Sequence, residues 1–163
     1  MMFEKTDARE WELTLLDAMP PSGGLGSLAA GDIDNDGTEE LIVGGGDALI
    51  WYRPATRERG IIDHGHFHVG LAVEDIDGDG VAEVVAGRND EHTGWGVVWY
   101  AHDGRLDGAW HRHEIARTCN GGAHDLLFAD IDGDGERELI ANATYCGRWG
   151  GYVYKRGSHA GEQ

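Results

Sequence analysis

Acidic residues recur at the same positions in three short segments of the sequence. Each segment has an aspartate at its first, third and fifth positions, a glycine at the sixth and a glutamate at the ninth. The acidic residues are Asp32, Asp34, Asp36 and Glu40; Asp75, Asp77, Asp79 and Glu83; and Asp130, Asp132, Asp134 and Glu138. Clustered carboxylates repel one another unless a cation lies between them. This spacing therefore predicts a site for one hard cation in each segment.

Calcium suits these loops better than magnesium does. Ca²⁺ accepts roughly six to eight oxygen ligands in flexible geometry, whereas Mg²⁺ requires a near-ideal octahedron. The glycine permits a sharp turn, and the backbone carbonyl of the seventh residue can supply a further oxygen. The seventh residues are Thr38, Val81 and Glu136. We expect three calcium ions, one in each loop, because a solvated acidic turn would account for one such segment better than for three.

An EF-hand loop begins with the same spacing, but two features exclude it. It requires a bidentate glutamate at the twelfth position and a helix on each side. The twelfth residues here are Val43, Ala86 and Ala141. A run of strand-forming residues, not a helical pattern, follows every loop.

The acidic segments belong to a longer unit that occurs three times. Residues 28–52, 71–100 and 126–154 each have a short apolar run before the loop, a β-branched run after it and then an aromatic run. Further short runs between the copies complete units of four strands. The spacing of Asp32, Asp75 and Asp130 is typical of propeller blades or solenoid repeats.

We expect an all-β fold, a β-propeller segment of three four-stranded antiparallel blades with the calcium loops between strands one and two. The blades span approximately residues 24–63, 66–116 and 123–155. Residues 10–17 are expected to form an outer strand of a preceding or closing blade. The third copy ends at Tyr154 with no run for a fourth strand.

These loops resemble those of the FG-GAP and VCBS repeat families, whose blades carry Asp-x-Asp-x-Asp-Gly-x-x-Asp/Glu after a short apolar strand. The resemblance covers roughly residues 24–155, with Leu25-Gly26 at the Phe-Gly position and Gly44-Gly45-Gly46 at the Gly-Ala-Pro position. It implies a calcium-binding propeller. Relatives of this kind include adhesion and lectin propellers and propeller polysaccharide lyases, so the resemblance leaves the function undecided.

Composition excludes two classes of partner. The 163 residues carry 30 acidic and 13 basic side chains, a formal net charge of -17. Such a charge repels phosphate backbones and anionic membranes. No apolar run approaches the ~20 residues that span a bilayer. We expect neither nucleic-acid binding nor membrane insertion.

Antiparallel strands reverse direction at each turn, which separates two faces of the propeller. The acidic loops lie on one face. The hairpins between strands two and three lie on the opposite face, together with the connections between blades. We expect that opposite face to bind a polysaccharide, a glycan or a protein ligand. The expected contacts are aromatic surfaces for stacking and polar groups for hydrogen bonding, from His66, His92, Trp95, Asp125 and Trp149.

The same face offers an alternative, a polysaccharide lyase that acts by β-elimination on a uronic-acid-containing chain. This reaction needs a base, an acid for the leaving oxygen and a cation for the developing charge. His68 or His124 would be the base and Tyr145 the acid, with Arg88 or Arg148 as the cation. A purely structural propeller segment is the third possibility.

Two further expectations concern assembly and compartment. Propellers usually close with ~4–8 blades, so we expect further blades in a longer chain, or a homo-oligomer that completes the ring. Cys119 and Cys146 share the face opposite the acidic loops, which makes a disulfide plausible. That bridge would indicate an extracellular, periplasmic or cell-surface protein, although this chain carries no signal peptide.

Overall fold

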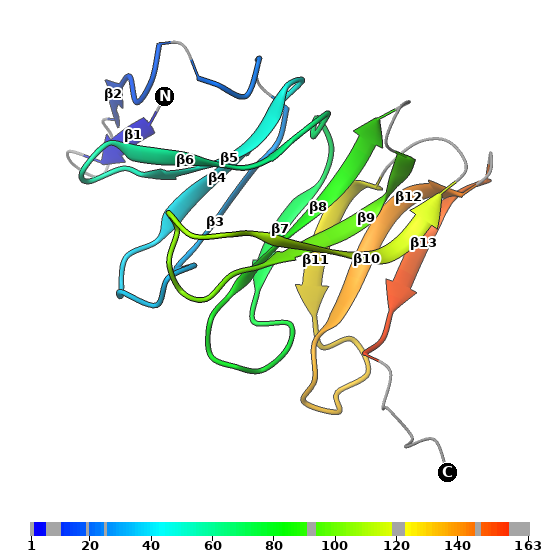
Figure 1. The fold of residues 1–163 in the computed structure, drawn as a ribbon. Coiled ribbons are helices and arrows are strands. Elements are labelled where there is room, and N and C mark those ends of the chain that lie inside the picture. Colours follow the sequence, from blue (N-terminus) through cyan, green and yellow to red (C-terminus); the bar gives the residue numbers. More distant parts are fainter. Residues whose placement is uncertain are drawn as a thin grey trace.

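The protein folds entirely into antiparallel β-sheets. The computed structural model describes residues 2–5, 11–18, 20–24, 26–90, 94–118, 123–145 and 148–156. These residues form thirteen strands and no helix. Three sheets, one for each repeat, stand side by side (Figure 1). The arrangement confirms the predicted all-β fold class and is consistent with a propeller-like segment.

The first two repeats form four-stranded sheets whose strands pair in sequence order. The first sheet consists of β3 (Leu28–Gly31), β4 (Glu40–Gly44), β5 (Ala48–Arg53) and β6 (Glu58–His64). The second consists of β7 (Leu71–Glu74), β8 (Glu83–Asp90), β9 (Gly94–Ala101) and β10 (His111–Thr118). The first strands are neighbours, since β3 lies beside β7 and β7 beside β11. Inner strands of propeller blades are adjacent in the same way.

The third repeat has one strand fewer among the described residues. Its sheet consists of β11 (Ala123–Ala129), β12 (Glu138–Tyr145) and β13 (Arg148–Tyr154). The prediction of four-stranded antiparallel blades is therefore confirmed for the first two sheets, and three strands of the third sheet are described.

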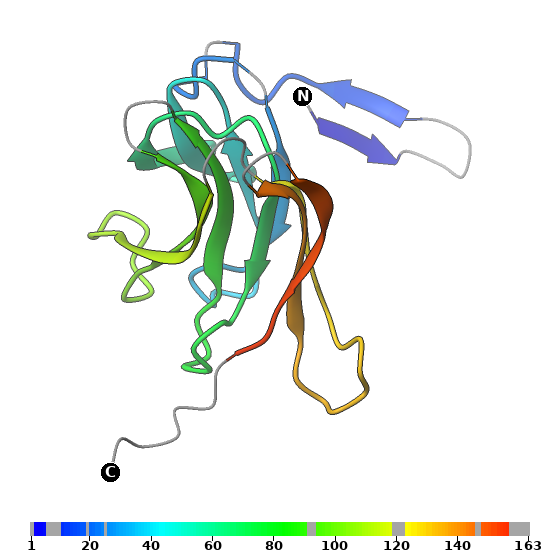
Figure 2. The same ribbon diagram turned by 90° about the vertical axis from the view of Figure 1, so that its right-hand side faces the viewer.

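A two-stranded sheet precedes the first repeat. Its strands, β1 (Met2–Lys5) and β2 (Trp11–Thr14), form an antiparallel hairpin. A strand therefore lies within residues 10–17, where an outer strand was expected, and β1 is its partner. Strands three and four of each complete sheet pair in the same antiparallel manner. Figure 2 shows this hairpin extending away from the three sheets.

Apolar side chains between adjacent sheets form the core. The interface between the first and second sheets is built from Ile33, Ile42, Leu49, Trp51, Leu71, Val84, Val98 and Tyr100, among others. The interface between the second and third sheets is built from Val85, Val97, Ala123, Phe128, Leu139 and Ala141, among others. The second sheet packs one face against the first sheet and its opposite face against the third. Packing therefore extends from one repeat to the next.

Within the described part of the chain, no other sheet covers the outward face of the third sheet. Ile33 and Ile131 occupy the same position in their acidic loops, yet Ile33 is 0% and Ile131 54% exposed. Trp51 in β5 and Val153 in β13 each directly precede the tyrosine of their strand, and their exposures are 7% and 47%. Leu127 is exposed on the same sheet. This face thus presents to solvent the side chains that the first sheet buries against its neighbour.

We expect the isolated chain to associate with itself through this face, because contiguous exposed apolar surface favours burial against a partner. Leu127→Glu should lower the molar mass toward that of one chain. Ile61→Glu is the matched control, because Ile61 is exposed on the outer strand β6. Light scattering behind a sizing column measures the mass. A compact wild-type monomer would show that three sheets suffice.

Candidate functional site

The three acidic loops lie at one end of the sheets, between the first and second strands of each repeat (Figure 1). In each loop the first aspartate accepts hydrogen bonds from backbone amides further along the turn. The two carboxylate oxygens of Asp32 accept from the amides of Asp36 at 3.0 Å and Gly37 at 2.9 Å. Asp75 and Asp130 accept in the same manner from the glycines of their loops. These bonds wrap the chain around the first carboxylate.

A glycine is required at the sixth position of every loop. Gly37, Gly80 and Gly135 have φ values of 88°, 89° and 93°, in the left-handed region. An added Cβ would meet no neighbouring atom there, so backbone conformation and not space selects glycine. The predicted role of glycine in the sharp turn is therefore confirmed.

The ninth-position glutamate lies buried at the base of each loop. Glu40, Glu83 and Glu138 are 0%, 1% and 3% exposed. Each carboxylate accepts a hydrogen bond from the amide of the second loop residue, at 3.3 Å, 2.7 Å and 3.1 Å respectively. A buried carboxylate needs compensating polar or positive groups, so these glutamates mark the places where a cation would be most favourable.

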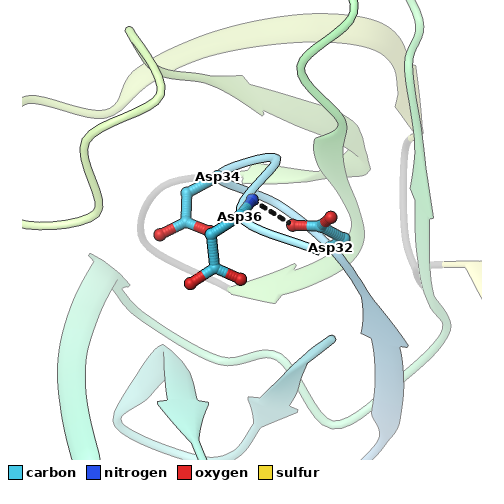
Figure 3. Close-up of side chains that lie close together, drawn as sticks. All are labelled: Asp32, Asp34 and Asp36. Atoms are coloured by element: carbon cyan, nitrogen blue, oxygen red, sulfur yellow. Dashed lines mark hydrogen bonds between the residues drawn. The ribbon is translucent and has the colours of Figure 1, made fainter. Parts of the chain in front are cut away.

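Carboxylate oxygens converge in all three loops. In the second and third loops the converging residues hold the first, third and ninth positions: Asp75, Asp77 and Glu83, and Asp130, Asp132 and Glu138. In the first loop they hold the first, third and fifth positions, namely Asp32, Asp34 and Asp36 (Figure 3). In each group the oxygens lie within 4.8 Å of one another. Of the side-chain carboxylates expected as ligands, Glu40, Asp79 and Asp134 lie outside these groups.

The electrostatics of the second loop fit a cation. Burial raises the pKa of Glu83 to about 7, and the charges of Asp77, Asp79 and Asp75 add to the effect, while the hydrogen bond from the Ile76 amide opposes it. A divalent cation among these oxygens would reverse that shift. The donors are all oxygens, which suit calcium or magnesium and not a thiolate- or imidazole-binding metal.

Two basic side chains that sequence reasoning missed lie against the acidic loops. Arg53 forms ion pairs with Asp34, Asp36 and Glu40 in the first loop. Lys155 forms ion pairs with Asp132 and Glu138 in the third. Each directly follows the tyrosine that ends its aromatic run in the sequence. This shared position after the tyrosine is the sequence signal that could have identified both residues.

At the opposite end, backbone hydrogen bonds gather the segments predicted to form a ligand face. The Phe67 amide donates to the Gly45 carbonyl at 2.7 Å, and the Asn89 amide donates to the His66 carbonyl at 3.0 Å. The Gly70 amide donates to the carbonyl of Ala123 at 2.9 Å. The connection that carries His66 and His68 therefore touches the hairpins of the first two sheets and the start of the third.

The exposed side chains of this end form two groups. The rings of His66 and His68 lie edge to face, with centroids 5.9 Å apart. The rings of His124 and Trp149 lie 5.3 Å apart, and Trp149 is 69% exposed. Asp125, which accepts a hydrogen bond from the Asn142 side chain, and Arg148 are exposed nearby on β11 and β13.

Arg88 lies beneath this face and not on it. Its side chain is buried and forms an ion pair with Asp63 at 3.5 Å, and it also donates to the His64 carbonyl at 3.3 Å. Its guanidinium carbon lies 5.6 Å from the centre of the Phe67 ring. The Tyr100 hydroxyl also donates to Asp63, at 2.7 Å, and burial raises the pKa of this phenol. This network braces the first sheet against the second.

Some predicted residues lie outside the described part of the chain. These are His92, Leu25 and both cysteines, Cys119 and Cys146. The backbones of Trp95 and Tyr145 are described and lie in β9 and β12, but their side chains are not. The disulfide, and the extracellular location inferred from it, therefore stay predictions.

A cavity of about 310 Å³ lies between the second and third sheets, at the end that carries the acidic loops. Its apolar wall includes Ile76, Ile115, Phe128, Leu139 and Tyr154. Charged side chains of Glu74, Asp75, Arg137, Lys155 and Arg156 line its rim. The cavity is thus remote from the predicted ligand face.

No helix among the described residues is long and apolar enough to cross a membrane.

Comparison with known families supports the repeat assignment. Residues 75–141, from the second acidic loop into β12, match the model of the FG-GAP-like repeat. The resemblance predicted from the acidic loops is confirmed over this range. No curated protein matches the chain.

We expect Arg88→Ala to destabilise the fold, because it leaves Asp63 without its buried cationic partner. The free energy of unfolding should fall by about 1–3 kcal/mol. Arg117→Ala is the control, because it removes only an exposed ion pair with Glu114. It should change the free energy of unfolding by less than about 0.5 kcal/mol. Denaturant unfolding of both variants measures the difference. Equal stability of the two would contradict a structural role for Arg88.

Proposed function

We propose that this chain is a calcium-stabilised segment of a β-propeller-type repeat protein. The observation that supports the proposal is the burial of a glutamate beside converging aspartates in every repeat. The first, third and fifth aspartates, the seventh carbonyl and the ninth glutamate would hold one ion in each loop. These five groups supply oxygen ligands of the type that calcium prefers, and one bidentate carboxylate would raise their number to six.

Bound calcium would connect the ends of the first and second strands of each sheet. Asp75 follows β7 directly, and Glu83 is the first residue of β8. The ion would therefore close the loop at the point where the two strands begin to pair. Because the unfolded chain does not hold these oxygens together, calcium would favour the folded state by mass action.

We expect calcium to raise the melting temperature. One site filled at roughly a hundred times its dissociation constant adds about 2.7 kcal/mol to the free energy of unfolding. That corresponds to a rise of about 5–10 °C for a domain of this size. Scanning calorimetry in excess chelator and in millimolar calcium measures the shift. Identical melting in both would reject the metal assignment.

Asp77→Ala should remove part of this calcium-dependent shift, because Asp77 belongs to the converging group of the second loop. Glu39→Ala is the matched control, since Glu39 is an exposed acidic residue of the first loop outside the converging group. It should keep the wild-type shift. Equal loss in both variants would indicate a general charge effect and no defined site.

Ligand binding at the opposite end is our second proposal, with carbohydrate as the ligand class. The supporting observation is the exposed indole of Trp149 beside the His124 ring. An aromatic face flanked by polar groups is suited to stacking against a sugar ring while hydrogen bonding its hydroxyls. Asp125 and Arg148 offer such groups on the same sheet.

The lyase is the alternative on this face. Because Arg88 is buried and bonded to Asp63, the exposed Arg148 is the better candidate to stabilise developing charge. His124 would then abstract the proton. A base acts mainly in the transition state, so its removal should abolish turnover while leaving substrate binding largely intact.

A panel of uronic and neutral polysaccharides, assayed with calcium present, separates these functions. If the face binds sugar, Trp149→Ala should weaken binding by about tenfold or more, the effect of ~1.4 kcal/mol. Trp11→Ala, which removes another exposed tryptophan, should have no effect. A lyase would instead give new ultraviolet absorbance from unsaturated uronate, which His124→Ala would abolish. Absence of both binding and turnover would leave a structural segment.

A further inference from the structure

The three acidic loops differ in one neighbouring residue. In every repeat the second and third strands begin to pair at a tyrosine. The first residue pairs are Leu41 with Tyr52, Val84 with Tyr100 and Leu139 with Tyr154. Leu41, Val84 and Leu139 each directly follow the ninth-position glutamate of their loop. The residue after each tyrosine therefore lies beside the loop. It is Arg53 in the first repeat, Ala101 in the second and Lys155 in the third.

In the first loop, Arg53 lies among three carboxylates. Its Nε donates to Glu40 at 3.0 Å, and its terminal nitrogen forms ion pairs with Asp34 and with Asp36, the latter at 3.7 Å. Glu40 has its other oxygen bonded to the Ile33 amide. Glu40 is also the one ninth-position glutamate that lies outside the converging group of its loop. Arg53 thus binds the carboxylate of Glu40, whereas the equivalent carboxylates of Glu83 and Glu138 converge with the aspartates of their loops.

The second loop has no equivalent cation. Among the described residues, no ion pair links Asp75, Asp77, Asp79 or Glu83 to a basic side chain. Ala101 holds the place of Arg53. Arg156 approaches the loop near Gly78 but forms no ion pair with it. Among the described residues, backbone amides donate the hydrogen bonds that these four acidic side chains accept.

The third loop is intermediate. Lys155 forms ion pairs with Asp132 and, at 3.6 Å, with Glu138. Both Lys155 and Asp132 are exposed, so solvent and salt screen this attraction. A lysine ammonium is also a single point charge, whereas the guanidinium of Arg53 is a planar group that can bond several carboxylates at once.

We propose that Arg53 is a built-in counter-ion of the first loop, so that the second loop depends most strongly on calcium, the third less and the first least. The inference rests on the proposed calcium binding for its metal-dependent part. A cation that enters the first loop must compete with the guanidinium for Asp34, Asp36 and Glu40. A cation that enters the second loop meets four carboxylates, none of which forms an ion pair within the described part of the chain.

An exchange of side chains tests this asymmetry. Arg53→Ala frees the first loop, and Ala101→Arg places a guanidinium at the equivalent position beside the second. Arg105→Ala is the control, because it removes the same charge from an exposed residue that pairs only with Asp107. Calorimetric titration of the full chain with calcium should show about tenfold or greater tightening of the weakest site in Arg53→Ala. Ala101→Arg should weaken the tightest site by a similar factor.

Melting in excess chelator tests Arg53 without any metal. Arg53→Ala should lower the melting temperature more than Arg105→Ala does, because the first loop loses its only positive charge among the described residues. Ala101→Arg should raise it. Cooperative melting of each variant verifies that it has folded.

The outcomes separate this inference from the proposed function. If the wild-type chain binds no calcium, the proposed function fails and the chelator experiment alone decides the role of Arg53. If the wild-type chain binds calcium but Arg53→Ala matches Arg105→Ala in titration and in melting, the counter-ion role is wrong and calcium binding stands.

Discussion

A carboxylate taken out of water costs several kcal/mol unless hydrogen bonds or positive charge compensate it, and every repeat of this protein buries one. Glu40, Glu83 and Glu138 lie at the base of their acidic loops, each bonded to one backbone amide. Nearby aspartates add repulsion. The remaining compensation must come from the chain or from the solvent. The first repeat supplies Arg53, whereas in the second repeat the proposed calcium ion would supply it.

This charge requirement is coupled to the packing between sheets. The Ile33 amide donates to Glu40, while the Ile33 side chain is fully buried in the interface with the second sheet. A loop that opened for lack of positive charge would therefore also withdraw a core side chain. Ile131 holds the same place in the third loop but is exposed, because no other sheet of the described residues packs against that face. The proposed metal binding and the packing between sheets would thus act on the same residue position.

The sequence predicted the features that depend on local spacing. The loop pattern gave the positions of the turns, the strands on either side and the two faces of the molecule. It missed Arg53 and Lys155, because their contact with the loops depends on how the third strand pairs with the second. It placed Arg88 on the ligand face by strand parity, whereas the connection that carries His64 and Phe67 crosses over that side chain. It also missed β1, whose four residues carry no repeat signature.

We propose that positive charge in the acidic loops stabilises the sheets, with calcium supplying that charge in the second repeat. Anomalous diffraction from crystals grown in calcium tests this most directly, because it locates the ion without assumptions about stability. We expect the strongest peak among the carboxylates of Asp75, Asp77 and Glu83 and the weakest in the first loop, beside Arg53. A second loop that is closed by its own hydrogen bonds and shows no peak at saturating calcium would contradict the proposed role of the ion.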